Sequence, residues 1–255
     1  MRTMTVEQAL VELEQRHRAL YATPEIDERL ASIVRAGPHT NLTEAAILHI
    51  LRSARSVFVD THVEVVSGHH TATYLRFESI ARYPDLIGLI ADDMATWIKQ
   101  TFQHGAVTGL LATASAARAL AQGVADRLQE AQLQEAQPLH VTLTPFSCET
   151  GRIGTDITVG AVTAQEGFLA LNDVTTRGNC VSKLGKVITD NGGRLVGMMV
   201  FARRDSGQFP LMKDLVAQYP FYYAADLEMP QWEPAQCPLC QSNKPLMSWK
   251  DMPEL

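Results

Sequence analysis

The first part of the chain has apolar residues at helical spacing. One face of the first predicted helix carries Val6, Leu10, Leu13 and Leu20. A second helix is predicted from Thr23-Pro24, a helix-start signal, to Gly37-Pro38, and a third covers about residues 42–54. No Gly/Ser linker follows. We therefore expect residues 1–55 to form an N-terminal helical extension that packs on the rest of the chain or on a protein partner.

From residue 56 onward, strand-like apolar segments alternate with helical ones. The strand-like segments include LHVTLTPF, EGFLALNDV, RLVGMMVFA and FYYAADLEM. The polar doublet LQEAQLQEAQ, residues 128–137, is predicted to be a solvated helix end. Such alternation predicts an α/β domain over residues 56–255, with a mostly parallel central sheet flanked by helices. In sheets of this kind, ligands bind beyond the carboxyl ends of the strands.

One of those strand ends is the stretch FLALNDVTTRGNC, Phe168 to Cys180. We predict a strand over Phe168–Leu171, a turn over Asn172–Asn179 and a helix from about Gly178. A turn at a helix N-terminus offers unpaired backbone N–H groups and the positive end of the helix dipole, which together bind phosphate.

The side chains of this turn extend that prediction. Gly178 permits close backbone approach, and Thr175, Thr176 and Asn179 add hydroxyl or amide donors. Asp173 is unsuited to phosphate, but its carboxylate can accept hydrogen bonds from sugar hydroxyls. A ribose 5-phosphate carries both groups. The alternative is a turn that only caps a helix.

Composition and charge narrow the classes of protein to consider. The chain has 255 residues, 46% of them hydrophobic, and a formal net charge of -6. This charge does not favour nucleic acid or anionic membranes as partners, and no apolar run reaches the length of a membrane span. Four cysteines in a chain of this length do not make a disulfide scaffold, so a reducing cytoplasm is the expected compartment.

Several motifs, in consistent order, resemble those of type I phosphoribosyltransferases, and of orotate phosphoribosyltransferases in particular. LNDVTTRGN resembles the phosphoribosyl-pyrophosphate signature, and SGHHTATYLRF resembles a segment near the start of the orotate enzymes. HGAVTGLLATASAARALA resembles their pyrophosphate-binding loop, and WEPAQCPLCQSNKPL resembles the Cys-Pro-Leu-Cys tail of some bacterial members. The similarity covers about residues 57–246 and implies the type I phosphoribosyltransferase fold, with a small hood over the sheet.

The resemblance also implies a role for each motif. Thr175, Thr176, Arg177, Gly178 and Asn179 would hold the 5′-phosphate, with Asn172 and Asp173 on the ribose hydroxyls. The pyrophosphate would meet Ala106, Val107, Thr108 and Gly109. The base would lie near Ser67, Gly68, His69, His70 and Thr71. Mg²⁺ would bridge the leaving group and the ribose hydroxyls, and catalysis would consist mostly of positioning and charge stabilisation.

The chain departs from the family pattern in three places. Asn172 stands where the signature has a second acid, which removes a negative charge beside a cationic transition state. Arg177 replaces a small residue and either reinforces phosphate binding or obstructs the cradle. A mobile lysine-bearing loop is absent, since no lysine lies between Lys99 and Lys183 and the corresponding loop offers only Arg152.

Cysteine and histidine offer a second kind of site. Cys237 and Cys240 in CPLC supply half of a zinc site, but no second CxxC or CxxH accompanies them, so zinc is not expected. His69-His70 has no third ligand at suitable spacing. A structural turn that happens to contain cysteines is the favoured interpretation.

Three functional hypotheses remain. The first is transfer of ribose 5-phosphate from phosphoribosyl pyrophosphate to a nucleobase, with orotate favoured by resemblance, in a homodimer. The second is a catalytically degenerate regulator or effector in a larger complex, such as a defence complex, to which Asn172, Arg177 and the N-terminal helices point. The third is hydrolysis of a nucleoside or nucleotide N-glycosidic bond.

Overall fold

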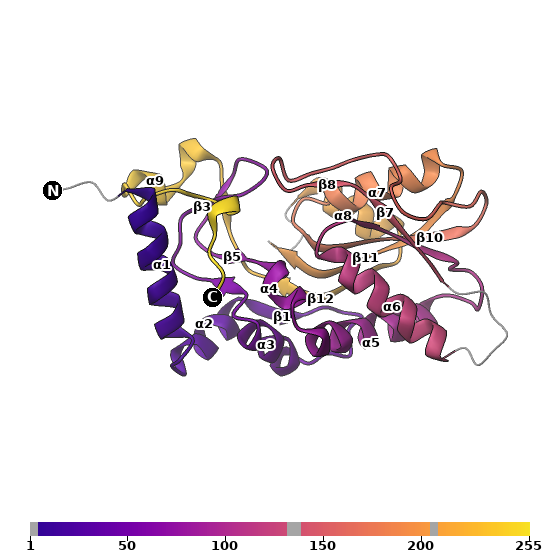
Figure 1. Cartoon of the computed structure of the whole chain (residues 1–255), viewed down its shortest axis with the longest axis horizontal. Coiled ribbons are helices and arrows are strands. Elements are labelled where there is room, and N and C mark those ends of the chain that lie inside the picture. Colours follow the sequence, from indigo (N-terminus) through magenta and orange to yellow (C-terminus); the bar gives the residue numbers. More distant parts are fainter. Residues whose placement is uncertain (1–4, 132–138, 205–208) are drawn as a thin grey trace.

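A six-stranded sheet forms the centre of the computed structural model, which describes residues 5–131, 139–204 and 209–255 (Figure 1). The strand order is β1-β12-β11-β10-β6-β7. The strands are β1 (Val34–Ala36), β6 (Gly109–Thr113), β7 (His140–Thr144), β10 (Gly167–Thr175), β11 (Arg194–Arg204) and β12 (Phe221–Leu227). Every pairing in this sheet is parallel except that of β1 with β12. The predicted mostly parallel sheet is thus confirmed.

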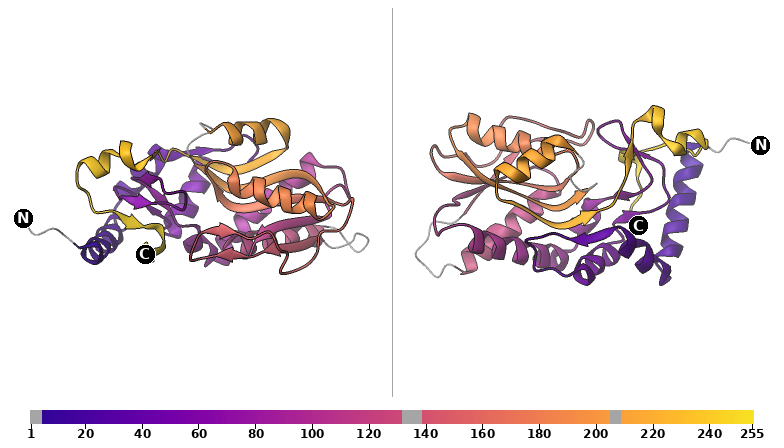
Figure 2. Two further views of the ribbon diagram at one scale, coloured as in Figure 1. Left: turned by 90° about the horizontal axis from the view of Figure 1, so that it is seen from above. Right: turned by 180° about the vertical axis from the view of Figure 1, so that it is seen from behind.

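Helices cover both faces of the sheet (Figures 1 and 2). Helices α5 (Pro84–Thr101) and α6 (Ala117–Ala131) pack on one face, and α7 (Asn179–Asp190) and α8 (Pro210–Gln218) on the other. Two apolar clusters, one on each face, are separated by the sheet. Within the described ranges, no helix is long and apolar enough to cross a membrane. The polar doublet expected at the end of α6 continues into residues 132–138, outside the described residues.

The N-terminal helices belong to the same body as the sheet. They are α1 (Val6–Leu20), α2 (Glu25–Ile33) and α3 (Glu44–Ser53). Ile26 of α2 and Ile47 of α3 are fully buried in the larger apolar cluster together with residues of α5. Helices α1 and α3 begin at threonine caps, as expected for good helix starts. The division between residues 55 and 56 remains a prediction.

The second helix ends four residues earlier than the sequence predicts. Helix α2 stops at Ile33, and β1 follows directly, pairing antiparallel with β12 at the edge of the sheet. Pairing gives the backbone of β1 the hydrogen bonds that a further helical turn would have supplied. The Gly37 N–H also donates to the Ala224 carbonyl at 2.9 Å. A Cβ at Gly37 would lie 1.9 Å from the Tyr223 carbonyl oxygen, so this close approach requires glycine.

A smaller unit, here called the hood, lies beside the carboxyl edge of the main sheet (Figure 2). Its four-stranded sheet has the order β13-β4-β3-β14. The strands are β3 (Val63–Glu64), β4 (His70–Thr71), β13 (Gln231–Trp232) and β14 (Met247–Ser248). Around it lie β2 (Val57–Phe58), β5 (Tyr74–Leu75), α4 (Phe77–Ala81), η1 (Pro234–Gln236), α9 (Pro238–Gln241) and η2 (Trp249–Asp251). The hood therefore joins the segment after α3 to the C-terminal tail, and α1 packs against it through Leu13.

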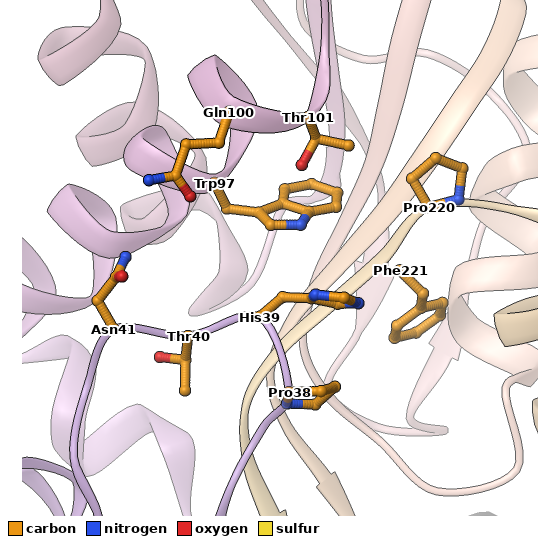
Figure 3. A pocket seen from close by; sticks show the side chains of 9 residues that line it. All are labelled: Pro38, His39, Thr40, Asn41, Trp97, Gln100, Thr101, Pro220 and Phe221. Atoms are coloured by element: carbon orange, nitrogen blue, oxygen red, sulfur yellow. The ribbon is translucent and has the colours of Figure 1, made fainter.

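A hollow of about 490 Å³ opens at the opposite, amino edge of the sheet, beside the first residues of β12 (Figure 3). Its lining is Pro38, His39, Thr40, Asn41, Trp97, Gln100, Thr101, Pro220 and Phe221. Asp93 of α5, only 5% exposed, lies next to it. Its carboxylate accepts hydrogen bonds from the Thr40 hydroxyl, from the Asn41 backbone and side-chain nitrogens at 2.8 and 2.9 Å, and from the Tyr222 hydroxyl at 2.6 Å. This network fastens the N-terminal segment to α5 and β12.

Candidate functional site

A cavity of about 450 Å³ lies between the carboxyl ends of β10 and β11 and the hood. Its lining comes from segments far apart in the sequence. The predicted site residues Asn172, Asp173, Thr176, Arg177, Asn179, Ser67 and Arg152 all line it. Strand–turn–helix geometry in an α/β sheet places ligands at this edge.

The turn in the signature stretch is shorter than predicted. Strand β10 runs on to Thr175, so Asn172 and Asp173 lie within the strand rather than in the turn, which comprises only residues 176–178. Pairing with β6 stops at Leu171, but pairing with β11 continues to Thr175 because β11 is the longer neighbour. Thr175 is consequently buried, with 1% exposure, while Thr176 and Arg177 face the cavity.

Helix α7 begins without a side-chain cap. Its N-cap is Gly178, whose φ of 86° is in the left-handed region that favours glycine. A Cβ there would lie 2.8 Å from Cδ1 of Leu215. Helices α1 and α3 have threonine oxygens that accept from their first-turn N–H groups, whereas α2, α5 and α8 lack a side-chain cap as α7 does. The first turn of α7 thus keeps N–H groups for an anion, and Asn179 and Cys180 in that turn line the cavity.

Asp173 is the carboxyl group placed beside this helix end. Burial raises its pKa to about 7, with a further contribution from the carboxylate of Glu78 in α4. A 2.7 Å hydrogen bond from the Val174 N–H to Oδ1 and the charge of Arg204 act in the opposite direction. A carboxyl group with a pKa near neutrality in a cavity is typical of a functional site.

Asn172 is held in a different way. Its side chain is 7% exposed, its Oδ1 accepts from the Thr113 hydroxyl at 3.1 Å, and its amide donates to the Val174 carbonyl at 3.1 Å. The amide group therefore connects the ends of β6 and β10. An aspartate at 172 would lose the donor to Val174 and face a carbonyl oxygen with a negative charge, so asparagine suits this position structurally.

Among the described lining residues of the cavity, four side chains are cationic and two are acidic. The cations are Arg152, Arg177, Lys183 and Arg204, and the acids are Glu78 and Asp173. Arg204, at the end of β11, donates from Nε to the Thr176 hydroxyl at 3.1 Å. Lys183 of α7 donates to the Ile153 carbonyl. Sequence reasoning missed Lys183, Arg204 and Glu78, although Arg204 ends an apolar strand at the same sheet edge, a signal that was available.

Arg177 lines the cavity and reaches the hood at His69, a point here called the cavity mouth. Its guanidinium contacts Nε2 of His69 in the hood and lies 4.8 Å from the centre of the Phe209 ring. Nδ1 of His69 is 3.2 Å from the Ser67 carbonyl oxygen, and its Nε2 lies between the Arg177 guanidinium, which only donates, and the Glu233 carboxylate, which only accepts, so these contacts do not assign the tautomer of His69. Glu233 Oε1 lies 2.5 Å from the same Nε2. The signature turn and the hood are thus joined directly.

The predicted base-side loop divides into two parts. Ser67 lines the cavity and His69 contacts Arg177, while Gly68 takes a φ of 78° in the turn before β4. His70 and Thr71 are buried in β4, with 4% and 0% exposure. His70 points to Cys240 rather than to the cavity, with 3.2 Å between its Nδ1 and Sγ.

The segment predicted to meet the pyrophosphate, Ala106 to Gly109, is at the wrong edge of the sheet. It leads into the amino end of β6, where the Thr108 N–H donates to the carbonyl of Gly167, the first residue of β10. Strands β6 and β10 are parallel, and Asn172 and Asp173 lie toward the carboxyl end of β10. A segment that enters the amino end of β6 therefore lies at the opposite edge of the sheet from them. The turn at the carboxyl end of β6 is formed instead by residues 114–116, and the Thr113 hydroxyl there bonds Asn172.

The chain is similar in sequence to known proteins. No protein-family model matches the chain. The orotate phosphoribosyltransferase of Caldicellulosiruptor bescii is 24% identical over 194 residues, which make up 75% of this chain and 90% of that protein. The orotate phosphoribosyltransferase of Thermus thermophilus is 28% identical over 189 residues, 74% of this chain and 91% of that protein.

Among solved structures, the orotate phosphoribosyltransferase from Aeropyrum pernix matches with a TM-score of 0.50 and 17% identity, covering 70% of this chain and 90% of that one. The fold is that of the type I phosphoribosyltransferases. In sequence, the chain is similar to orotate phosphoribosyltransferases, so the resemblance found in its motifs is confirmed.

Proposed function

We propose that the cavity binds a ribose 5-phosphate compound, either phosphoribosyl pyrophosphate or a nucleotide, and that the protein transfers the phosphoribosyl group to a nucleobase. One observation carries the proposal. An uncapped helix N-terminus and a carboxyl group with a pKa of about 7 lie at the same strand end, in a cavity whose described lining has more cationic than acidic side chains. The helix end suits a phosphate, and the carboxyl group suits the hydroxyls of an attached sugar.

The 5′-phosphate is assigned to the residues around the start of α7. Thr176 and Asn179 offer side-chain donors, and the backbone of Gly178 permits close approach. Arg204 supports the Thr176 hydroxyl and adds positive charge to this end of the cavity. Arg177 has a buried Nε atom with no hydrogen-bond partner among the described residues, so an anion in the turn would give that group an acceptor.

The ribose is assigned to Asp173 alone. Its carboxyl group lines the cavity, whereas the oxygen and nitrogen of Asn172 are already engaged with Thr113 and Val174. As a carboxylate, Asp173 would accept from ribose hydroxyls and stabilise positive charge that develops on the sugar when the bond at C1′ opens. Binding a cationic partner would lower the pKa of Asp173 and favour that form.

The residues present fit a magnesium ion that arrives with the substrate. Mg²⁺ prefers oxygen ligands and is commonly held by one or two carboxylates together with substrate phosphates. Asp173 supplies one carboxyl group at the strand end. When bound, the ion would supply positive charge beside the departing diphosphate. Arg152, which also lines the cavity, is assigned as a further cation for the diphosphate.

The acceptor base is assigned to the side of the cavity formed by the hood, near Ser67. Orotate is the first candidate, because the relatives that cover about three quarters of the chain are named orotate phosphoribosyltransferases. Catalysis of this kind requires little covalent chemistry from the protein. Without a lysine-bearing loop, the protein would still contribute by positioning the substrates and by stabilising charge.

The test combines calorimetry with a turnover assay. Titration with phosphoribosyl pyrophosphate and Mg²⁺ is expected to show one binding site, and incubation with a panel of bases including orotate is expected to release pyrophosphate and form a nucleotide. Asp173→Ala should abolish turnover. No binding of phosphoribosyl pyrophosphate, ribose 5-phosphate or orotidine 5′-phosphate would refute the assignment of the cavity. Binding without turnover would instead indicate the regulatory alternative, and free base released without pyrophosphate would indicate hydrolysis.

A further inference from the structure

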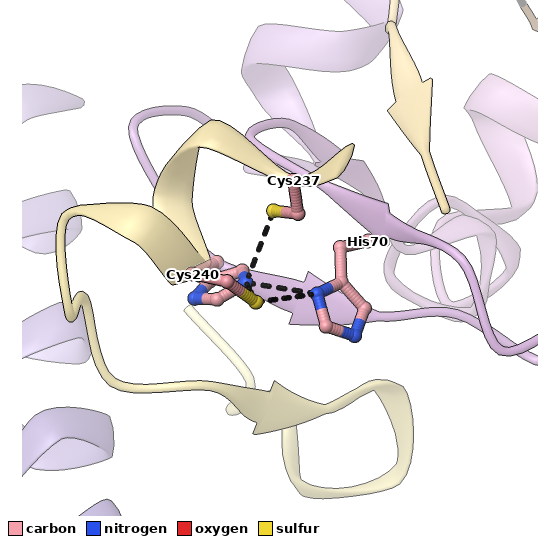
Figure 4. A group of neighbouring side chains, drawn as sticks. His70, Cys237 and Cys240 are labelled. Atoms are coloured by element: carbon pink, nitrogen blue, oxygen red, sulfur yellow. Dashed lines mark hydrogen bonds between the residues drawn. The ribbon is translucent and has the colours of Figure 1, made fainter. Parts of the chain in front are cut away.

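Four metal-ligating side chains meet inside the hood, away from the cavity. They are His62, just before β3, His70 in β4, Cys237 before α9 and Cys240 within α9. Their ligand atoms all lie within 4.8 Å of one another. Cys237, His62 and His70 are buried, with 0%, 1% and 4% exposure. Figure 4 shows Cys237, Cys240 and His70 turned toward a common centre.

Four of the six distances between ligand atoms are close to those around a tetrahedral ion. His62 Nε2 lies 3.5 Å from Cys237 Sγ, 3.6 Å from Cys240 Sγ and 3.1 Å from His70 Nδ1. Cys240 Sγ lies 3.2 Å from His70 Nδ1. Zinc bonds of about 2.3 Å to sulfur and about 2.0–2.1 Å to nitrogen separate neighbouring ligands of a tetrahedron by about 3.3–3.8 Å. These four pairs of ligand atoms need shifts of a few tenths of an ångström, and the two other pairs, Cys237 with Cys240 and with His70, already lie within 4.8 Å.

The histidine tautomer also agrees with a metal site. Nδ1 of His62 is 2.8 Å from the Lys244 carbonyl oxygen, which can only accept a hydrogen bond. Nδ1 therefore has the proton, and the lone pair of Nε2 faces the two sulfur atoms. Such a backbone carbonyl behind a histidine is the usual second partner that orients a metal ligand. Two thiolates would balance the charge of a divalent ion.

We propose that His62, His70, Cys237 and Cys240 bind one structural Zn²⁺ ion. A closed set of two histidines and two cysteines leaves no open position for a substrate, which is characteristic of structural zinc. Sequence spacing could not reveal the site, because 175 residues separate His62 from Cys237 and 170 separate His70 from Cys240. The expectation from the sequence that the two cysteines lack further ligands is corrected by this geometry.

The ion would fix the C-terminal tail to the hood. Each strand of the hood sheet has only two residues, so its hydrogen bonds give little stability, and small units of this kind commonly depend on a metal. His70 directly follows His69, and Cys237 lies four residues after Glu233. The metal would therefore also hold the two hood residues that contact each other at the cavity mouth.

Metal analysis of purified protein tests the proposal. We expect elemental analysis by plasma mass spectrometry to find about one zinc per chain. The Cys237→Ser, Cys240→Ser double variant should retain none. Cys148→Ser and His49→Asn, which change an exposed cysteine and a histidine outside the cluster, should retain the ion. Wild-type protein that contains no zinc and takes up none from Zn²⁺ solution would overturn the proposal, as would a double variant that keeps its metal.

A measurement on the unaltered chain covers the case in which the double variant does not fold. Replacement of zinc by Co²⁺ should give the visible and thiolate charge-transfer absorption of tetrahedral cobalt with sulfur ligands. A chelator should release the ion, lower the melting temperature and expose two additional thiols, and added Zn²⁺ should reverse all three changes. An octahedral cobalt spectrum, or a Cys237–Cys240 disulfide in protein purified under reducing conditions, would contradict a zinc site.

Discussion

The sheet has a hollow at each edge, and the two are nearly equal in volume, at about 490 Å³ and about 450 Å³. The one at the amino edge has no Asp, Glu, Lys or Arg among its described lining residues, while the one at the carboxyl edge has six. Size therefore does not distinguish a ligand site from a gap between elements. The direction of the parallel strands does, because it collects strand ends, turns and helix N-termini at one edge only.

Two carboxyl groups, Asp93 near the hollow at the amino edge and Asp173 in the cavity at the carboxyl edge, differ in the same way. Asp93 accepts four hydrogen bonds from Thr40, Asn41 and Tyr222. Asp173 accepts a backbone hydrogen bond, faces Glu78 and has its pKa raised to about 7 by burial. A carboxylate with a full set of donors contributes to stability, whereas one that is desolvated without them costs stability and is available for a ligand. Substitutions at the two positions should have opposite consequences.

The largest effect is expected at Asp93. Asp93→Ala removes four hydrogen bonds to the carboxyl group and leaves the buried Tyr222 hydroxyl with only the Thr40 hydroxyl, at 3.5 Å, as an acceptor, so it should lower the free energy of unfolding by about 3–5 kcal/mol. Denaturant melts measure this. The adjacent Asp92→Ala, which removes an exposed carboxylate paired with Arg127, should cost about 0–1 kcal/mol. Equal losses of stability in the two variants would mean that the hydrogen bonds of Asp93 do not stabilise the attachment of the N-terminal segment to α5 and β12.

A smaller effect is expected at Arg177. If the guanidinium contacts the bound phosphate, Arg177→Gly should weaken binding of ribose 5-phosphate compounds by about 1.5–3 kcal/mol, the contribution of a hydrogen bond to a charged group. Calorimetry measures it, with Arg177→Met to separate loss of charge from added backbone freedom. Arg35→Met, at an exposed arginine of β1, is the control. Binding that is equal or tighter in both Arg177 variants would show that the side chain obstructs the turn.

Sequence reasoning succeeded where the signal was local. The alternation of strands and helices predicted the sheet, and FLALNDVTTRGNC predicted a cavity-lining strand end, because a strand, a turn and a helix follow one another within this one short stretch. It failed where pairing between distant segments decides the outcome. Strand β1 forms only because β12 offers an open edge, and the length of β11 extends β10 past Asn172. The four zinc-type ligands meet only when the tail folds back on the hood.

The stability of the Asp173→Asn variant relative to wild type should depend on pH. The folded-state pKa of Asp173 is raised from 3.8 to about 7, so the native protein binds more protons than the unfolded chain between these values and loses stability as pH rises. The amide that replaces the carboxyl group does not titrate. The variant should match wild type near pH 4 and exceed it by roughly 1–2 kcal/mol at pH 8, less than the full shift implies because the cavity is open to solvent.

Thermal melts across this pH range measure the difference, with Asp190→Asn as the control. Asp190 is an exposed carboxylate at the other end of α7, paired with Lys186, and its variant should show no such dependence on pH. A difference between Asp173→Asn and wild type that stays constant with pH would mean that the carboxyl group is ionised throughout. The distinction between Asp93 of α5 and Asp173 of β10 would then rest on hydrogen bonds alone.

The smallest effect is expected at Glu233, which approaches the same His69 nitrogen as Arg177 but from solvent. Its side chain is 60% exposed, and exposed ion pairs contribute about 0–1 kcal/mol. Glu233→Gln should therefore change the affinity for ribose 5-phosphate compounds by less than about fivefold in calorimetry. His69→Ala, which removes the partner of Arg177, should change it more. If Glu233→Gln weakened binding as much as Arg177→Gly, the position of Arg177 and His69 would depend on the Glu233 carboxylate. The C-terminal tail would then contribute to ligand binding.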